Sequence, residues 1–219
     1  MTCLVLLVIP GTAEATVAWS NGTATGIGSN CDFTGGACPG GDTGWTIFDN
    51  FDLSTQDTVS GFSYISDFSV GSASDYLSTN WSLWSVDPLG PFNSIGPVAT
   101  GHTVAALTTN DLSVTTYTFT ITGLSVNLPP GTYWLGYENV LAGDGAVTLD
   151  VMSNGTALAG YEEQSGDKEY GFTYTSGNTA FTIENNPEPG SLWLVALAGA
   201  AFFIKLRIRP RMKQIPALA

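Results

Sequence analysis

Residues Val114 to Thr122, VTTYTFTIT, have the clearest strand pattern in this chain. Three large apolar side chains alternate with threonines, which is the period-2 pattern of a strand that has one buried and one solvated face. β-Branched and aromatic residues favour extended backbone, so the segment predicts a strand. We expect the core-facing side to hold Tyr117, Phe119 and Ile121, and the outward side to hold Thr116, Thr118, Thr120 and Thr122.

The same alternation recurs before and after this segment. Ala146 to Met152 predicts a strand with Val147, Leu149 and Val151 inward and with Thr148 and Asp150 outward. Further strands are predicted at Val17–Trp19, Trp45–Leu53, Val59–Ser66, Trp81–Val86, Tyr133–Tyr137, Tyr170–Tyr174 and Ala180–Ile183. The segments between them are rich in Gly, Pro, Asn and Asp, and no stretch before Ser191 keeps a helical period. Short strands without crossover helices predict an all-β fold, an antiparallel β-sandwich or jelly roll.

Composition indicates an ordered and acidic domain. The 219 residues suit one domain, and 8 Tyr, 11 Phe and 6 Trp supply the aromatic content that disordered chains lack. All 19 acids lie between Glu14 and Glu188, where Lys168 is the single cation. Nucleic acids bind to basic surfaces, so this charge distribution argues against a nucleic-acid partner.

The N-terminal end has the composition of a targeting segment. Residues 4–9, LVLLVI, are apolar, and Ala13-Glu14-Ala15 is a small-x-small cleavage pattern. Together they predict a signal peptide over residues 1–15 and a folded domain over residues 16–184. No basic residue precedes the apolar run, and a start codon placed too far downstream would account for this. The alternative is a buried first strand.

The C-terminal end predicts a linker, a membrane span and a basic tail. Residues 185–190 contain two prolines, which cannot continue a sheet ladder. Residues 191–208 cover roughly 27 Å as a helix if the long stems of Lys205 and Arg207 snorkel, which suffices for a thin span. Five cations crowd into residues 205–213. The positive-inside rule therefore predicts that residues 209–219 are cytoplasmic and that the domain faces out.

The order of features in this tail resembles a known sorting signal. Pro187-Glu188-Pro189 is followed by an apolar run with Trp193 and Gly199, and then by the basic residues Lys205, Arg207, Arg209 and Arg211. This order resembles the PEP-CTERM signal of Gram-negative bacteria over residues 187–213. The resemblance implies processing by an exosortase-type membrane enzyme and a link to exopolysaccharide or biofilm. An ordinary single-span anchor is the alternative.

Two segments of the body carry a looser resemblance to the same proteins. Leu128-Pro-Pro-Gly-Thr-Tyr-Trp-Leu and Trp45-Thr-Ile-Phe-Asp-Asn-Phe resemble strand entries in their exported jelly-roll domains. The implied location is the inner membrane with the domain outside the cytoplasm, and then the cell surface or the medium after processing.

Cysteine and histidine offer little catalytic chemistry. Cys31 and Cys38 bracket a Gly-rich loop and predict a small disulfide in an exported protein, with two unrelated thiols as the alternative. The lone histidine, His102, is expected in a surface loop, and no nucleophile elbow accompanies it. A serine hydrolase is therefore disfavoured.

Acidic and aromatic residues leave three further possibilities open. Asp49, Asp52 and Asp144 are weak calcium candidates, because acid-rich segments offer hard oxygen ligands, although such acids commonly just face water. No other metal or cofactor is expected. Trp84 and Trp134 are candidate glycan contacts, with core packing as the alternative. A glycoside hydrolase would need two facing carboxylates among the strand acids Asp49, Asp52, Asp67, Glu138 and Asp150.

The leading hypothesis is therefore a non-enzymatic cell-envelope or matrix protein that is exported by means of its sorting tail. A carbohydrate-binding β-sandwich is the second hypothesis, which an exposed aromatic row on one sheet face would favour. A glycan-active hydrolase is the third.

Overall fold

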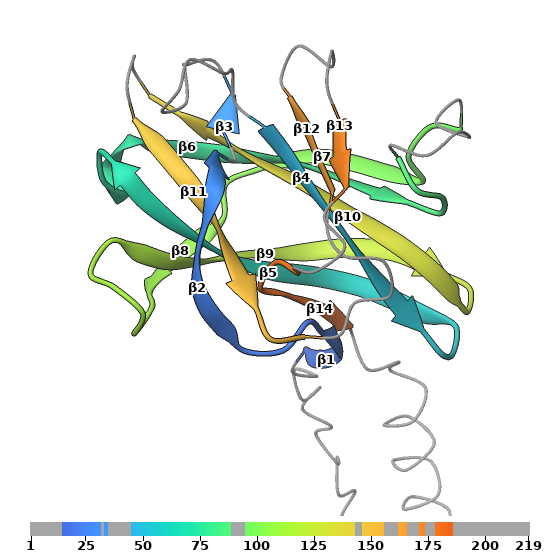
Figure 1. Ribbon diagram of the computed structural model, residues 1–219. Coiled ribbons are helices and arrows are strands. Elements are labelled where there is room, and N and C mark those ends of the chain that lie inside the picture. The colour runs from blue at the N-terminus through green and yellow to red at the C-terminus, as the bar shows by residue number, and fades with distance from the viewer. Residues whose placement is uncertain are drawn as a thin grey trace, which may run out of the picture. The chain divides into compact units, whose positions relative to one another are not determined.

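The computed structural model of the chain (Figure 1) describes residues 15–31, 33–34, 45–88, 95–142, 146–155, 162–165, 171–173 and 178–185. They belong to one compact unit, Ala15–Asn186. The predicted signal peptide, sorting motif and membrane span lie outside the described residues. Within the described part, no helix is long and apolar enough to cross a bilayer. The helical content of this part is a single short 3-10 turn, η1 (Ala73–Asp75).

The strands form two seven-stranded sheets that face each other as two layers (Figure 1). Sheet A consists of β1 (Thr16–Ser20), β2 (Ala24–Cys31), β5 (Asp57–Val70), β8 (Ala106–Thr109), β9 (Thr116–Leu128), β11 (Val147–Ser153) and β14 (Phe181–Asn185). Sheet B consists of β3 (Phe33–Thr34), β4 (Trp45–Leu53), β6 (Tyr76–Trp84), β7 (Ala99–Thr103), β10 (Gly131–Leu141), β12 (Glu162–Ser165) and β13 (Gly171–Thr173). The prediction of an all-β, antiparallel fold is confirmed, except that the short β3 pairs with β10 in parallel.

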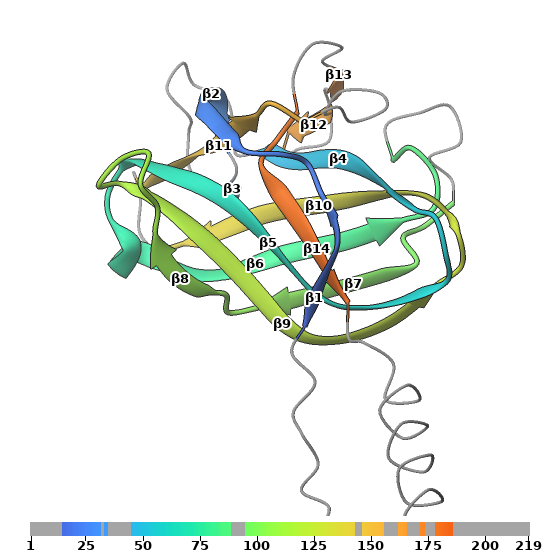
Figure 2. The same ribbon diagram turned by 90° about the horizontal axis from the view of Figure 1, so that it is seen from below.

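Strand β5 organises sheet A. One of its edges pairs with β9, and the other pairs first with β14 and then with β11. At the outer edge of the sheet, β1 pairs with β14, and β2 pairs with β11 (Figure 2). In sheet B, β10 is central and lies between β4 and β6.

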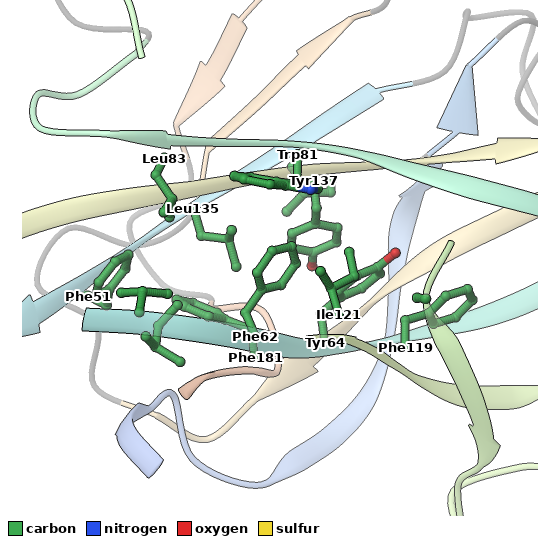
Figure 3. Close-up of a cluster of buried hydrophobic side chains, with 14 of the residues drawn as sticks. Phe51, Phe62, Tyr64, Trp81, Leu83, Phe119, Ile121, Leu135, Tyr137 and Phe181 are labelled. Atoms are coloured by element: carbon green, nitrogen blue, oxygen red, sulfur yellow. The ribbon is translucent and has the colours of Figure 1, made fainter. Parts of the chain in front are cut away.

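The core lies between the two sheets and is rich in aromatic rings. Tyr64 on β5 stacks on Tyr137 on β10, with ring centroids 4.2 Å apart, and Phe62 meets Trp81 edge-on at 5.9 Å. Figure 3 shows these side chains pointing toward one another from both layers. Gly101 on β7 makes room for the indole of Trp81, since a Cβ there would lie 2.4 Å from the ring.

The strand at Val114–Thr122 behaves largely as its alternation predicts. Phe119 and Ile121 are fully buried, and Thr122 is exposed. Thr116 lies on the predicted outer side beside Asp67, but its side chain is buried there, and its hydroxyl donates to Asp67 Oδ1 (3.0 Å). Strand β9 also continues past Thr122 to Leu128, where it pairs with the start of β5.

The orientation predicted for the strand near residue 150 is right for Val147, which belongs to the core cluster, and wrong for Thr148 and Asp150, because the register shifts between Val147 and Thr148. Thr148 and Asp150 pair with Phe68 and Ser66 of β5, so they share the core-facing side of sheet A and are fully buried. The alternation does not predict which side chains of β11 face the core, because both faces of this strand are buried. Val151, on the other face, is also fully buried. Amphipathic alternation carries no orientation signal in a strand of this kind.

A chain of hydrogen bonds runs through the core. The amide of Ala105 donates to Tyr76 Oη (2.8 Å), and this hydroxyl contacts Thr79 Oγ1 (2.8 Å). Tyr64 Oη lies 2.6 Å from Thr79 Oγ1 and donates to Asn139 Oδ1 (2.5 Å). Asn139 Nδ2 in turn donates to the hydroxyls of Ser66 (3.4 Å) and Thr148 (3.3 Å). Buried polar groups need such partners, and these residues link four strands of the two sheets.

Candidate functional site

The outer face of sheet B gathers aromatic side chains. Trp84 on β6 is the register partner of Trp134 on β10, which in turn pairs with Asn50 on β4. Side chains that are directly paired across strands share one face of a sheet. Both tryptophans therefore lie on the outer side, while Trp81 and Tyr133 point into the core.

Phe48 extends this aromatic group along β4. Its ring meets that of Trp84 edge-on, with centroids 6.4 Å apart and planes at 82°. Gly136, which lies opposite Phe48 on β10, permits this approach, because a Cβ there would lie 2.5 Å from the phenyl ring and 2.6 Å from Ser82 Oγ. We call Phe48, Trp84 and Trp134 the outer aromatic group.

Exposure differs among the three rings. Trp134 and Phe48 are buried, at 6% and 4% exposed, whereas Trp84 is half-buried. The indole nitrogen of Trp84 donates to Ser82 Oγ (2.8 Å), which fixes the orientation of the ring. Trp84 is thus the member of the group that offers a surface to a ligand, and the two buried rings support it.

Polar residues form a parallel row on the same face. Asn80 of β6 pairs with Glu138 of β10 on one side and with His102 of β7 on the other. His102 Nδ1 donates to Asn80 Oδ1 (2.7 Å). His102 lies on strand β7 and not in the predicted loop, although it is exposed as expected. Hydrogen-bonding groups next to a fixed aromatic ring are the usual components of a site for polar ligands with apolar faces.

A second group of polar residues is buried where the two sheets meet. β1 ends at Ser20 and β2 begins at Ala24, and between them Gly22 adopts a left-handed backbone (φ 81°). At this break Asn21 is 1% exposed, and its Nδ2 donates to Asp49 Oδ2 (2.8 Å) and to the carbonyl oxygen of Thr179 (3.0 Å). Thr179 donates to the same Asp49 oxygen from its backbone nitrogen (2.8 Å) and from its hydroxyl (3.1 Å). We call Asn21, Asp49 and Thr179 the junction triad.

Burial dominates the electrostatics of the junction triad. Removal of Asp49 from water raises the pKa of its carboxyl from 3.8 to about 7, although hydrogen bonds from Thr179, Asn50 and Asn21 partly oppose this rise. All six Lys and Arg residues lie outside the described residues, so the described donors to this carboxylate are neutral.

The predicted acidic candidates do not converge. Asp49 faces the core from β4, whereas Asp52, on the same strand, is exposed and accepts a hydrogen bond from Thr132 (2.7 Å). The strand predicted at Trp45–Leu53 is β4, and the alternation of this strand sends the two carboxylates to opposite faces of sheet B. Within the described residues, no group of three His, Cys, Asp or Glu side chains is placed to hold a metal ion.

The other three acids that the sequence places on strands also point to different faces of the two sheets. Asp67 is buried on the outer side of sheet A, where it accepts hydrogen bonds from Thr115 (2.7 Å) and Thr116. Asp150 faces the core, and Glu138 lies half-buried on the outer face of sheet B. Asp49, Asp67 and Asp150 thus depart from the expectation that such acids simply face water.

Several predicted sites fall wholly or partly outside the described residues. Cys31 ends β2, but its expected partner Cys38 is not among the described residues, and neither is the calcium candidate Asp144. The same holds for the sorting motif 187–189 and for the anchor residues of the tail. These interpretations remain predictions.

Sequence reasoning missed the junction triad and the part played by Phe48. One signal was present: Ile47, Asp49, Phe51 and Leu53 share a face of the strand Trp45–Leu53, so an acid lay on its apolar side. Asn21 and Thr179 carried no comparable signal, because only the pairing of distant strands brings them to Asp49.

No family model matches this sequence, and a search of curated proteins likewise finds no match.

Proposed function

We propose that this chain is an exported, non-enzymatic protein of a bacterial cell envelope that binds exopolysaccharide through the outer face of sheet B. In this proposal the β-domain is a jelly-roll-like sandwich, residues 191–208 are its membrane anchor, and residues 187–213 are the sorting signal read by an exosortase-type enzyme. The tail's composition and order of features support the sorting role. The outer face of sheet B supports the binding role.

The observation that carries the binding role is the placement of Trp84. It is a half-buried indole, held by Ser82 and packed on Phe48, beside a row of amide, imidazole and carboxylate groups. A sugar ring has apolar C–H faces that stack on an aromatic ring and hydroxyls that bond to such polar groups. A preoriented indole also loses little conformational entropy when a ligand binds.

Charge points to the class of glycan. Glu138 lies on the proposed face, and the described residues contain no Lys or Arg. A carboxylate on this face repels uronate or sulfate groups, and no residue of the face that the structure describes is a cation that could pair with them. The expected ligand is therefore a neutral polysaccharide.

Asp52 and Glu138 lie too far apart on the outer face of sheet B to act together as a hydrolytic pair of carboxylates. Asp52 pairs with Thr132 on β10, and Glu138 lies six residues further along that strand. At about 3.3 Å per residue this separates the two acids by roughly 20 Å, twice the spacing of about 10 Å that a glycoside hydrolase can use.

A glycan array with the full chain tests the binding role. We expect retention on neutral glycans, and Trp84→Ala should weaken it by at least about fivefold through the loss of stacking. Val114→Ala is the matched control, because Val114 is 89% exposed and lies on sheet A's β8–β9 connection. Silence of the wild type on all glycans, or equal binding by Trp84→Ala, would refute the binding role.

Intact-mass measurement of membrane and released fractions tests the sorting role separately. In a host with an exosortase, the wild type should lose its tail and Glu188→Ala should keep it. A full-length wild type in such a host would leave residues 187–213 as a plain anchor.

A further inference from the structure

The junction triad brings a nucleophile, a base and an amide to one buried point. The hydroxyl of Thr179 and the side-chain amide of Asn21 both donate to Asp49 Oδ2, so they lie within two hydrogen bonds of each other. The second acceptor of Asn21 Nδ2, the carbonyl oxygen of Thr179, fixes which end of the amide faces the carboxylate. All three residues are at most 1% exposed.

The chemistry of these three groups is complementary. A hydroxyl becomes a nucleophile when an adjacent carboxylate takes its proton, and a primary amide is an acyl donor that releases ammonia. Fixed proximity replaces a bimolecular encounter by an intramolecular one and so lowers the activation barrier.

We propose that Thr179 and Asn21 form an intramolecular ester. Thr179 Oγ1 attacks Cγ of Asn21, and its proton passes to Asp49. The tetrahedral intermediate collapses with cleavage of the Cγ–Nδ2 bond, and Asp49 returns the proton to the departing nitrogen. The products are one Oγ1–Cγ ester bond and one ammonia, so atoms and charge balance and no external reactant is required.

The state of Asp49 suits both halves of this cycle. Its pKa of about 7 allows the same carboxyl to accept a proton in the first half and to donate it in the second at neutral pH. Asp49 contacts both reacting groups and is therefore a catalytic residue for the bond.

A buried atom without a partner supports the direction of the reaction. Asn21 Oδ1 is buried and accepts no hydrogen bond among the described residues. It lies against Gly155, where a Cβ would approach it to 2.2 Å. An amide oxygen left unpaired in the interior is costly, whereas an ester oxygen is a weaker acceptor and loses less when it is desolvated. Exclusion of water from the same place protects the ester from hydrolysis.

The position of the bond gives it a mechanical consequence. Thr16 of β1 pairs with Asn185 of β14, so both ends of the folded domain leave the same edge side by side (Figure 2). A force that pulls the two ends apart separates β1 from β14 one residue pair at a time. Asn21 and Thr179 lie at the inner end of this strand pair, so an ester between them would stop the separation of the two strands.

Peptide mapping of the full chain tests the proposal. After digestion at aromatic residues, we expect the peptide that contains Asn21 to be joined to the peptide that contains Thr179, with a combined mass lower by one ammonia. The link should disappear in Thr179→Val and Asp49→Asn, and it should persist in the matched control Thr182→Val, which changes a half-buried threonine of β14.

Two results would overturn the proposal. Recovery of the two wild-type peptides unlinked, with Asn21 intact, would refute the reaction, and this readout does not depend on whether any variant folds. Loss of ammonia at Asn21 that persists in Thr179→Val would instead assign the change to cyclisation with the next residue, Gly22. Neither result bears on glycan binding.

Discussion

At the scale of single residues, Asp49 has the most unusual environment of the described acids. It lies on the core side of β4 at 0% exposure, and every described donor to it is neutral. Burial of a carboxylate among neutral donors favours its protonated form, which is why its pKa rises to about 7.

This pKa predicts a pH dependence of stability with a definite sign. Between about pH 4 and pH 7 the folded state binds more protons at Asp49 than the unfolded state, so the free energy of unfolding falls as the pH rises through this window and levels off above it. A rise of about three units corresponds to a contribution on the order of 4 kcal/mol. Asp49→Asn should remove this contribution, as measured by urea denaturation at about pH 4.5, which lies within this window, and at about pH 7.5, which lies above it.

Asp52→Asn is the control for this experiment, because Asp52 is exposed on the same strand. It should keep the wild-type pH dependence. The same slope in wild type and Asp49→Asn would contradict the assignment of a raised pKa to Asp49.

At the scale of elements, the hydrogen-bonded chain through the core links strands that the apolar cluster alone would leave free to slide. Tyr64 Oη stands at its centre, between Thr79 of β6 and Asn139 of β10. A register slip would leave buried amide and hydroxyl groups unpaired, so the chain specifies one alignment of the two sheets.

Tyr64→Phe should destabilise the domain by about 1–3 kcal/mol, because it leaves buried partners of the hydroxyl unsatisfied while keeping the stacked ring. Tyr117→Phe is the matched control: Tyr117 is half-buried on β9, and its change should stay within about 0.5 kcal/mol. Thermal and urea unfolding measure both. Equal effects of the two substitutions would show that the hydroxyl of Tyr64 contributes nothing specific.

Elements with clean alternation could be predicted from sequence, and others could not. The strand Trp45–Leu53 has the predicted bounds, because large apolar residues mark one of its faces. Strands β2, β7 and β8 were missed, since Gly, Ala and Thr dominate them and neighbouring strands determine their extended backbone. The junction triad depends on three segments far apart in sequence, which no local pattern reveals.

Trp84 was a candidate glycan contact from its position in the sequence alone. The packing of Phe48 against Trp84 could not be predicted, because it depends on the register of β4 and β10.

At the scale of the whole molecule, the folded unit and the ends have separate compositions. Among the described residues, the buried cluster between the sheets lies within residues 47–183, whereas five of the six cations lie in residues 205–213 of the sequence. We therefore expect the domain to fold without the basic end.

Residues 15–186 alone should unfold in one cooperative transition, with a Tm within about 3 °C of the full chain. A fragment of residues 24–186 is the comparison, because it lacks β1 and with it the packing of Trp19 on Phe181 (centroids 4.9 Å). It should melt at a clearly lower temperature. A broad, non-cooperative transition in residues 15–186 would contradict the assignment of an independent domain.

The central claim is that the chain leaves the cytoplasm and is held in the surrounding polysaccharide by the outer face of sheet B. Its most direct test is the distribution of wild type and Trp84→Ala among cytoplasm, membrane, extracellular matrix and medium of cells that make a neutral exopolysaccharide. The account predicts wild type in the matrix and Trp84→Ala in the medium. Wild type confined to the cytoplasm, or an identical distribution of the two proteins, would contradict it.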